Sequence, residues 1–194
     1  QKIVTWNPLP MDPYDRVQKY DGTFLYRNPY VLAPCYAVSG QLDQFEWGED
    51  PLESQNHLMN ALMGDDTDYF IKLQKGTEYL ENKTAQTTTY LITMPYSGPL
   101  YAYFPKGTGG ESPPETPLSI NNEYQLDLYI NETDCTLYMG TYEKGEVVSI
   151  TIEADTELLK TSDNVFYVLD LPAFSNAVSH LRAHQIEISD WGAG

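Results

Sequence analysis

Two histidines stand at a spacing that could bind a metal. His180 and His184 are four residues apart in "HLRAH", the spacing that brings two side chains to one face of a helix. Metalloprotease helices use this spacing with a glutamate directly after the first histidine. Here that glutamate is missing and no third ligand is evident nearby. We therefore interpret the pair as part of a solvated helix face and predict no metal site.

Acidic residues offer two further kinds of chemistry. The run "GDDTDYF" contains Asp65, Asp66 and Asp68, and alternating oxygen ligands of this type bind calcium in helix–loop–helix sites. The later glycine and the terminal glutamate of such loops are missing, so an acidic loop after a helix is the simpler interpretation. Carboxylate pairs hydrolyse sugars, but the chain has 28 acidic residues and pairs arise by chance. We name no catalytic residue and expect no cofactor.

Tyrosine is unusually frequent, with 16 residues. It suits the half-buried surface of a sheet, and its ring can also stack on the apolar C–H face of a sugar. Tyr101 and Tyr103 on one expected strand and Tyr129 on another are predicted to point outward. These three are our candidate carbohydrate contacts, and the alternative is packing under a loop or against a partner domain.

All three tyrosines lie on expected β-strands. Apolar and polar residues alternate with a period of two in several runs, and turn signals such as "YSGP" and "EKGE" separate them. The runs cover residues 87–94, 99–104, 124–130, 146–153 and 165–170. Short strands at this spacing predict a mainly-β fold, an antiparallel jelly-roll-like β-sandwich resembling carbohydrate-binding modules, with two short flanking α-helices.

The first flanking helix has clear end signals. Asp50 is a good N-cap, Pro51 suits the first helical position, and Glu53 lies three residues after the cap. Gly64 provides a C-terminal stop, so we predict a helix over residues 51–63. Residues 171–185, after the sandwich, hold the second helix and the start of a following strand.

The organisation predicted from these elements is a single domain over residues 1–194. Residues 1–80 hold extended segments, among them "GTFLYRNPYVL", and the first helix, and residues 85–170 hold the sandwich. Prolines and polar residues dominate residues 1–21, where "NPLPMDPYD" favours neither helix nor central strand.

Composition narrows the class of function. The chain has 194 residues, 41% of them hydrophobic, with 28 acidic against 11 basic residues and a net charge of −17. Nucleic-acid binding needs a basic surface, so we exclude it. We find no apolar run of the ~18–20 residues that a spanning helix needs and no leader pattern, and we expect a soluble piece excised from a longer protein. The two cysteines, Cys35 and Cys135, match no zinc or redox spacing; we expect an inert thiol at Cys135 and leave a bridge between them open.

The segments "YRNPYVLAPCYAV" and "DPLESQNHLMNALMG" together resemble a two-part signature of the YfhO family of bacterial membrane proteins. In that family an "NPYALPLG"-like strand precedes a proline-capped helix, and the resemblance extends to "SGPLYAYFP" and more loosely to "LPAFSNAVSHLRAH". Two departures are "APCY" in place of the usual "LPLGY" and Leu52 where Phe is common. The residues that carry the signature are Asn28, Pro29, Tyr30, Leu32, Pro51, Glu53, Gln55, Asn56, Leu58, Ala61, Leu62 and Gly64.

The resemblance implies an integral membrane glycosyltransferase that uses lipid-linked sugars and acts on lipoteichoic acid or other cell-surface glycans in Gram-positive bacteria. This chain would be its extracytoplasmic domain at the cell membrane, with the transmembrane part of the same polypeptide and the glycan acceptor as partners. The catalytic acid would lie in the transmembrane part, so the chain itself would be non-catalytic. Its capped helix would be scaffold, or its polar face of Glu53, Gln55, Asn56 and His57 would meet the membrane part or the acceptor.

Two other interpretations stay open. A secreted or surface carbohydrate-binding or adhesive module would explain the sandwich and the outward tyrosines, and it predicts saccharide binding that weakens when Tyr101 or Tyr103 is truncated. A stand-alone glycosidase would have to hydrolyse a glycoside through a carboxylate pair. Spanning segments encoded on both sides of this chain would favour the membrane glycosyltransferase over both.

Overall fold

The computed structural model of the protein describes residues 2–5, 15–32, 36–84, 87–105, 116–128, 134–153 and 165–185. The chain divides into two compact units. The first contains Gln1–Glu46, Asn56–Tyr69 and Leu171–Gly194, and the second contains Trp47–Gln55 and Phe70–Asp170. The sandwich predicted at residues 85–170 thus belongs to the second unit, which also includes strands before residue 85.

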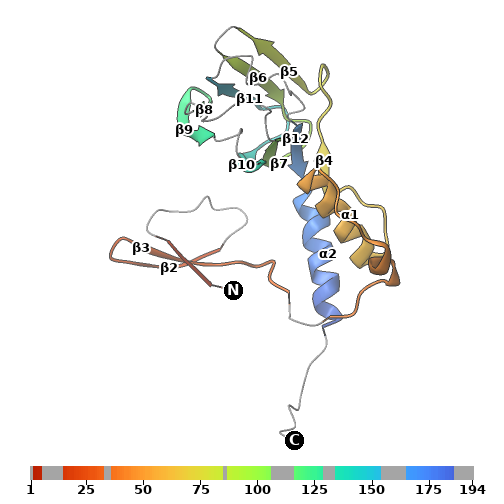
Figure 1. The fold of residues 1–194 in the computed structure, drawn as a ribbon. Coiled ribbons are helices and arrows are strands. Elements are labelled where there is room, and N and C mark those ends of the chain that lie inside the picture. Colours follow the sequence, from red (N-terminus) through yellow and green to blue (C-terminus); the bar gives the residue numbers. More distant parts are fainter. Residues whose placement is uncertain are drawn as a thin grey trace, which may run out of the picture. The chain divides into compact units, whose positions relative to one another are not determined.

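The second unit is a sandwich of two antiparallel sheets (Figure 1). One sheet has the strand order β10-β7-β12-β4 and the other has the order β5-β6-β11-β8-β9. The four strands of the first are β4 (Phe70–Lys72), β7 (Gly98–Phe104), β10 (Cys135–Tyr142) and β12 (Val165–Leu169). The five strands of the second are β5 (Tyr79–Lys83), β6 (Thr88–Thr93), β8 (Thr116–Ile120), β9 (Glu123–Leu128) and β11 (Val147–Ile152).

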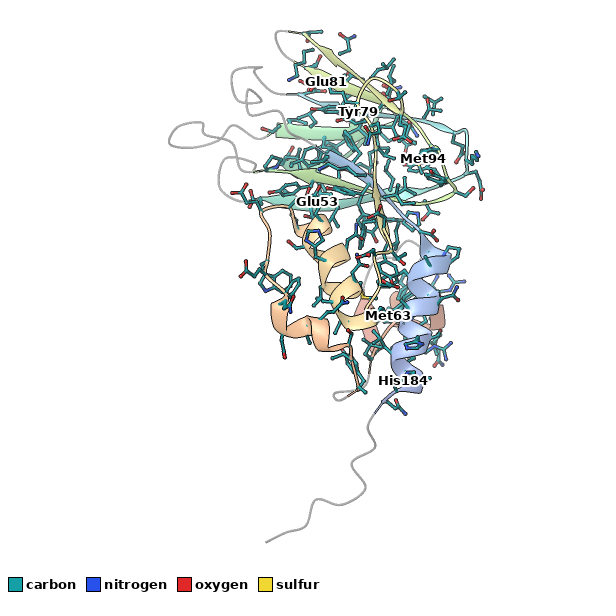
Figure 2. The ribbon with its side chains drawn as sticks, turned by 90° about the vertical axis from the view of Figure 1, so that its right-hand side faces the viewer. Glu53, Met63, Tyr79, Glu81, Met94 and His184 are labelled. Carbon is teal, nitrogen blue, oxygen red and sulfur yellow. The ribbon has the colours of Figure 1, made fainter. Side chains whose placement is uncertain are left out.

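The inward residues of both sheets form one hydrophobic core. Phe166 is fully buried at its centre, with Tyr79, Tyr90 and Phe104 around it at ring-centroid distances of 5.1, 5.0 and 6.5 Å. Figure 2 shows Tyr79 and Met94 among the side chains of the sandwich, and both belong to this core. Such edge-to-face ring contacts add to the free energy gained by burial. The predicted mainly-β antiparallel sandwich with two helices is confirmed.

The strand alternation read from the sequence matches the burial on β6 and at the inward positions of β7. On β6, Tyr90 and Ile92 are buried while Leu91 is exposed, and on β7 Leu100 and Ala102 are fully buried. For β10 the sequence indicated only the alternation of Cys135, Leu137 and Met139 in "DCTLYM". β4, β5 and β8 were not predicted. They are three to five residues long, too short for a convincing alternation.

The first unit contains a three-stranded antiparallel sheet of order β1-β3-β2. Its strands are β1 (Lys2–Thr5), β2 (Asp15–Tyr20) and β3 (Thr23–Arg27). Only β3 corresponds to a predicted extended segment. β2 is an edge strand, and its residues 16–19 are all exposed, so these four residues form no buried apolar face that a sequence pattern could have indicated.

Both predicted helices are present. α1 spans Pro51–Met63, the predicted range, and α2 spans Leu171–Ala183. α2 buries Ala177, Val178 and Leu181 along one stripe, as expected of an amphipathic helix. A short 3₁₀ helix, η1 (Gly40–Gln44), precedes α1.

Candidate functional site

A row of tyrosines crosses the outer face of the four-stranded sheet. Tyr101 on β7 is the register partner of Tyr138 on β10 and of Tyr167 on β12, which in turn pairs with Lys72 on β4. Side chains alternate between the two faces of a strand, and Leu100, next to Tyr101, lies in the core. The row therefore lies on the opposite face from the core.

The start of α1 covers one end of this row. The hydroxyl of Tyr167 donates a 2.6 Å hydrogen bond to Oδ2 of Asp50. Asp50 also caps the helix, because its Oδ1 accepts from the backbone N–H groups of Leu52 and Glu53 at 2.9 and 3.3 Å. Lys72 forms a 2.5 Å ion pair with Glu53, which lies in the first turn of α1 (Figure 2). The carboxylate of Asp50 thus caps the N-terminus of α1 and also anchors the helix to the sheet.

The environment of Tyr167 keeps its hydroxyl protonated. The residue is fully buried, and burial, followed by the hydrogen bond to Asp50 and the nearby charge of Glu53, raises the pKa of the phenol far above its ordinary value. Lys72 lies over the ring, with Nζ 5.8 Å from the ring centroid. A phenol held neutral acts as a hydrogen-bond donor and not as a base, so this arrangement is a structural anchor.

Tyr101 and Tyr103, two of the three predicted sugar contacts, differ from each other in burial and in their contacts. Tyr103 is 7% exposed, and its hydroxyl donates to the backbone carbonyl of Glu49 at 3.3 Å, just before α1. Burial, and then the surrounding carboxylates, raise the pKa of this phenol. Tyr101 is half-buried between Phe70 and Tyr138, with ring-centroid distances of 5.5 and 5.7 Å. Tyr129 lies outside the described residues.

The first part of the sequence signature, residues 28–32, is held against α2; we refer to it as the NPYVL segment. Oδ1 of Asn28 accepts from the N–H of Tyr30 at 2.8 Å, a local turn typical of Asn before Pro. The guanidinium of Arg182 donates to the carbonyls of Pro29 and Val31. The ring of Tyr30 also contacts Phe174, at a centroid distance of 5.5 Å.

The rest of the helix signature has mixed roles. Asn56 is 7% exposed and Gln55 is exposed. Gly64 has a φ of +74°, and its N–H donates to the carbonyl of Asn60 at 2.7 Å. A positive φ is easily adopted only by glycine, so Gly64 ends the helix as predicted.

A polar groove lies beside α1 within the first unit, and it is our candidate functional site. η1 and α1 form two walls of the groove, and Ser39 links them. Its N–H donates to the carbonyl of Leu62 on α1 at 3.0 Å, and its hydroxyl caps η1. The groove has a volume of about 670 Å³. It is lined by Gln41, Gln44, Phe45, Glu46, His57, Asn60, Ala61, Asp65 and Asp66.

The side chains of the groove suit hydrogen bonding more than covalent chemistry. Amides, carboxylates and an imidazole both donate and accept hydrogen bonds, and Phe45 adds one apolar ring. Asp65 is held in place by the hydroxyl of Tyr69 at 3.2 Å, and burial followed by the charge of Asp65 raises the pKa of that phenol. Oδ1 of Asn60 is buried and has no hydrogen-bond partner among the residues that the structure describes.

The remaining candidate residues are placed as follows. Asp65, Asp66 and Asp68 follow α1 in a loop, and the part of the chain that the structure describes contains no group of three His, Cys, Asp or Glu side chains arranged for a metal ion. The rings of His180 and His184 lie 4.4 Å apart, centroid to centroid. The thiol of Cys135 is free and half-buried, and burial raises its pKa; Cys35 lies outside the described residues.

Sequence reasoning missed the two sheet residues that hold α1. Lys72 and Tyr167 lie 19 and 117 residues from their partners on the helix, so no local pattern links them. The groove was missed for the same reason, because η1 and α1 meet only through the fold. The only available signal was the pair of polar runs that flank the helix.

Comparison with known proteins identifies one family. A family model described as bacterial membrane protein YfhO matches residues 2–193. No curated protein and no solved structure matches the chain significantly. Among the described residues, neither helix has the length and apolar character needed to cross a membrane.

Proposed function

Because the chain belongs to the YfhO family of bacterial membrane proteins, we propose that it is the extracytoplasmic domain of a polytopic membrane glycosyltransferase. The enzyme transfers sugars from lipid-linked donors to lipoteichoic acid or other cell-surface glycans. This domain is non-catalytic and serves as a scaffold that positions the acceptor. The family match over residues 2–193 is the observation that carries the proposal.

The contacts of the signature residues support a scaffold role. Glu53 of the signature holds the start of α1 to Lys72 of the sheet, and Asp50, which directly precedes the signature position Pro51, holds it to Tyr167. The NPYVL segment is held by Arg182 of α2. Most positions that carry the family resemblance therefore make internal contacts, which is what a scaffold needs.

The groove supports the acceptor-positioning part of the proposal. A polyhydroxyl acceptor presents many hydroxyl groups, and each can donate to a carboxylate or accept from an amide. The groove offers Glu46, Asp65 and Asp66 together with Gln41 and Gln44. Ligand pockets are usually lined mainly by apolar side chains. Polar side chains dominate this lining and Phe45 is its one aromatic ring, which suits a polyhydroxyl ligand better than an apolar one.

The central test is sugar transfer by the full-length protein in lipid vesicles that contain a polyprenyl-linked sugar and lipoteichoic acid. We expect transfer by the full-length protein and none by the 194-residue chain alone. Transfer by the chain alone would show that the catalytic residues lie within it. If the full-length protein transferred no sugar to any of a panel of acceptors, the glycosyltransferase proposal would be wrong.

A second experiment asks whether the groove positions the acceptor. Asp66→Asn and His57→Ala in the full-length protein should raise the KM for the acceptor several-fold and leave kcat nearly unchanged, because uniform binding is lost. Gln55→Ala is the matched control, since Gln55 is exposed on the same helix but does not line the groove. If the KM for the acceptor in all three variants equals that of the unaltered protein, the groove does not position the acceptor and the domain is a scaffold only.

The carbohydrate-binding module is the second candidate function. It is favoured by the half-buried pair Tyr101 and Tyr138 on the outer face of the sheet. Saccharide binding by the chain should then weaken in Tyr101→Ala. Tyr103→Ala tests the same face, but Tyr103 is 7% exposed and packs by Glu49, so we expect its effect to come through folding stability. Flat titrations over a broad glycan set would count against this function.

A further inference from the structure

The end of α2 presents two imidazoles to solvent. His180 and His184 are both exposed, and their ring centroids are 4.4 Å apart with an interplanar angle of 36°. His184 lies at the C-terminal end of the helix (Figure 2). The sequence spacing alone indicated only a shared face, whereas the structure brings the two rings into contact.

The tautomer of His184 follows from its hydrogen bond. Nδ1 of His184 lies 2.8 Å from the backbone carbonyl oxygen of His180. A carbonyl oxygen can only accept, so Nδ1 carries the proton, and in the neutral ring Nε2 keeps its lone pair. Histidines that bind metals commonly donate their other N–H to a backbone carbonyl in this way, which fixes the orientation of the ring.

The backbone of His184 is held in place as well. Its carbonyl accepts from the N–H of Ala37 at 2.9 Å, and its own N–H donates to the carbonyl of Leu181 at 3.1 Å. The next residue, Gln185, forms a bridge with Tyr36. The end of the helix is therefore fixed, and a ligand would have to orient only the ring of His180.

We propose that His180 and His184 form a bidentate site for a divalent transition-metal ion, with water completing the coordination. Bonds of about 2.0–2.1 Å from one nitrogen of each ring to a shared ion, at N–metal–N angles of about 90–110°, would place the ring centres roughly 4.5–5.3 Å apart. A small outward movement of one ring from the observed 4.4 Å separation would satisfy this. The chain's net charge of −17 raises the local concentration of cations. Imidazole ligands select Cu²⁺, Zn²⁺ or Ni²⁺, with Cu²⁺ bound most tightly, whereas Mg²⁺ and Ca²⁺ take oxygen ligands.

This site is independent of the proposed glycosyltransferase function and differs from the multi-ligand metal centres of enzymes. Within the described residues no third His, Cys, Asp or Glu completes a metal-binding group. Two protein ligands leave coordination positions open. The ion would therefore sit at the surface, available to water or to a further ligand.

The test is calorimetric titration of the 194-residue chain with Cu²⁺, together with electron paramagnetic resonance of the complex at one equivalent. His180→Gln and His184→Gln should each weaken the tightest binding event at least about tenfold, since even substitutions of residues behind the ligands lower metal affinity about 10–100-fold. The spectrum should show coupling to two nitrogens in the unaltered chain and to one in each variant. A tenfold excess of Mg²⁺ should not compete.

His57→Gln is the matched control, because His57 is an exposed histidine on the other helix. It should bind Cu²⁺ as the unaltered chain does. The proposal is overturned if the affinity is the same in His180→Gln and His184→Gln as in the unaltered chain, or if His57→Gln weakens binding equally. Either result would mean that carboxylates or scattered groups hold the ion. Circular dichroism of each variant confirms that α2 is intact.

Discussion

Replacing Tyr167 by phenylalanine should separate the contribution of one hydroxyl from that of the whole core. The ring stays in place, and only the 2.6 Å hydrogen bond to Asp50 is lost. A hydrogen bond to a charged group contributes about 1.5–3 kcal/mol. Asp50 keeps its two bonds to the N-terminal N–H groups of α1, so we expect the free energy of unfolding to fall by about 2 kcal/mol.

Urea denaturation followed by circular dichroism measures this change, provided that the slope m is the same for both proteins. Tyr138→Phe is the matched control, because its hydroxyl makes an exposed hydrogen bond with Thr141; we expect a change within about 0.5 kcal/mol. A cycle that adds Asp50→Asn to Tyr167→Phe should give a coupling energy of about 1–2 kcal/mol. A coupling energy within about 0.3 kcal/mol of zero would refute the anchor.

The same hydroxyl predicts a dependence on alkaline pH. The pKa of Tyr167 is raised in the folded protein by burial and by Asp50, whereas an unfolded tyrosine titrates near pH 10. The stability that Tyr167 contributes is therefore fully present below about pH 10 and is lost as the pH rises above it. Relative to Tyr167→Phe, the unaltered chain should lose up to about 1.4 kcal/mol per pH unit there. Parallel pH profiles for the two proteins would contradict the assigned environment.

Three further substitutions test other parts of the fold by the same unfolding measurement. Gly64→Ala should destabilise by about 1 kcal/mol because of its positive φ, whereas Gly40→Ala, which has open space around it, should be nearly neutral; equal effects would argue against the helix stop. Gly98→Ala should destabilise by about 1–3 kcal/mol, since a Cβ there would lie 2.7 Å from the carbonyl oxygen of Leu169, and an unchanged midpoint would show that the strands can separate. Arg182→Ala should increase hydrogen exchange in the NPYVL segment, which loses its donor, and unchanged exchange would mean that other contacts hold it.

The helix boundaries could be predicted because the signals are local. Asp50 caps α1, Pro51 begins it and Gly64 ends it. Each acts on residues a few positions away, so the local sequence sets the helix boundaries. Inward positions on β6, β7 and β11 were predictable for a similar reason, because alternation follows from the strand itself. Helix boundaries and strand alternation can be predicted without knowing which elements pack against the helix or strand.

The order of the strands, and the segment that lies over the outer face of the four-stranded sheet, could not be predicted. Tyr103 was correctly assigned to the face away from the core, but the sequence does not reveal that the turn at Glu49 lies over it. β4 contributes Lys72 from only three residues, too few for a pattern. The groove depends on how Ser39 bonds to Leu62. Each is a long-range contact that periodicity does not encode.

Asp50 and the signature residue Glu53, at the start of α1, are better explained by folding than by chemistry. The carboxylate of Asp50 accepts hydrogen bonds from two helix N–H groups and from Tyr167 at once, so both of its oxygens are engaged in holding the fold. Glu53 is similarly engaged with Lys72. We therefore expect any contact of α1 with the acceptor at His57 and Asn60, which line the groove. These side chains do not take part in the anchor between α1 and the sheet.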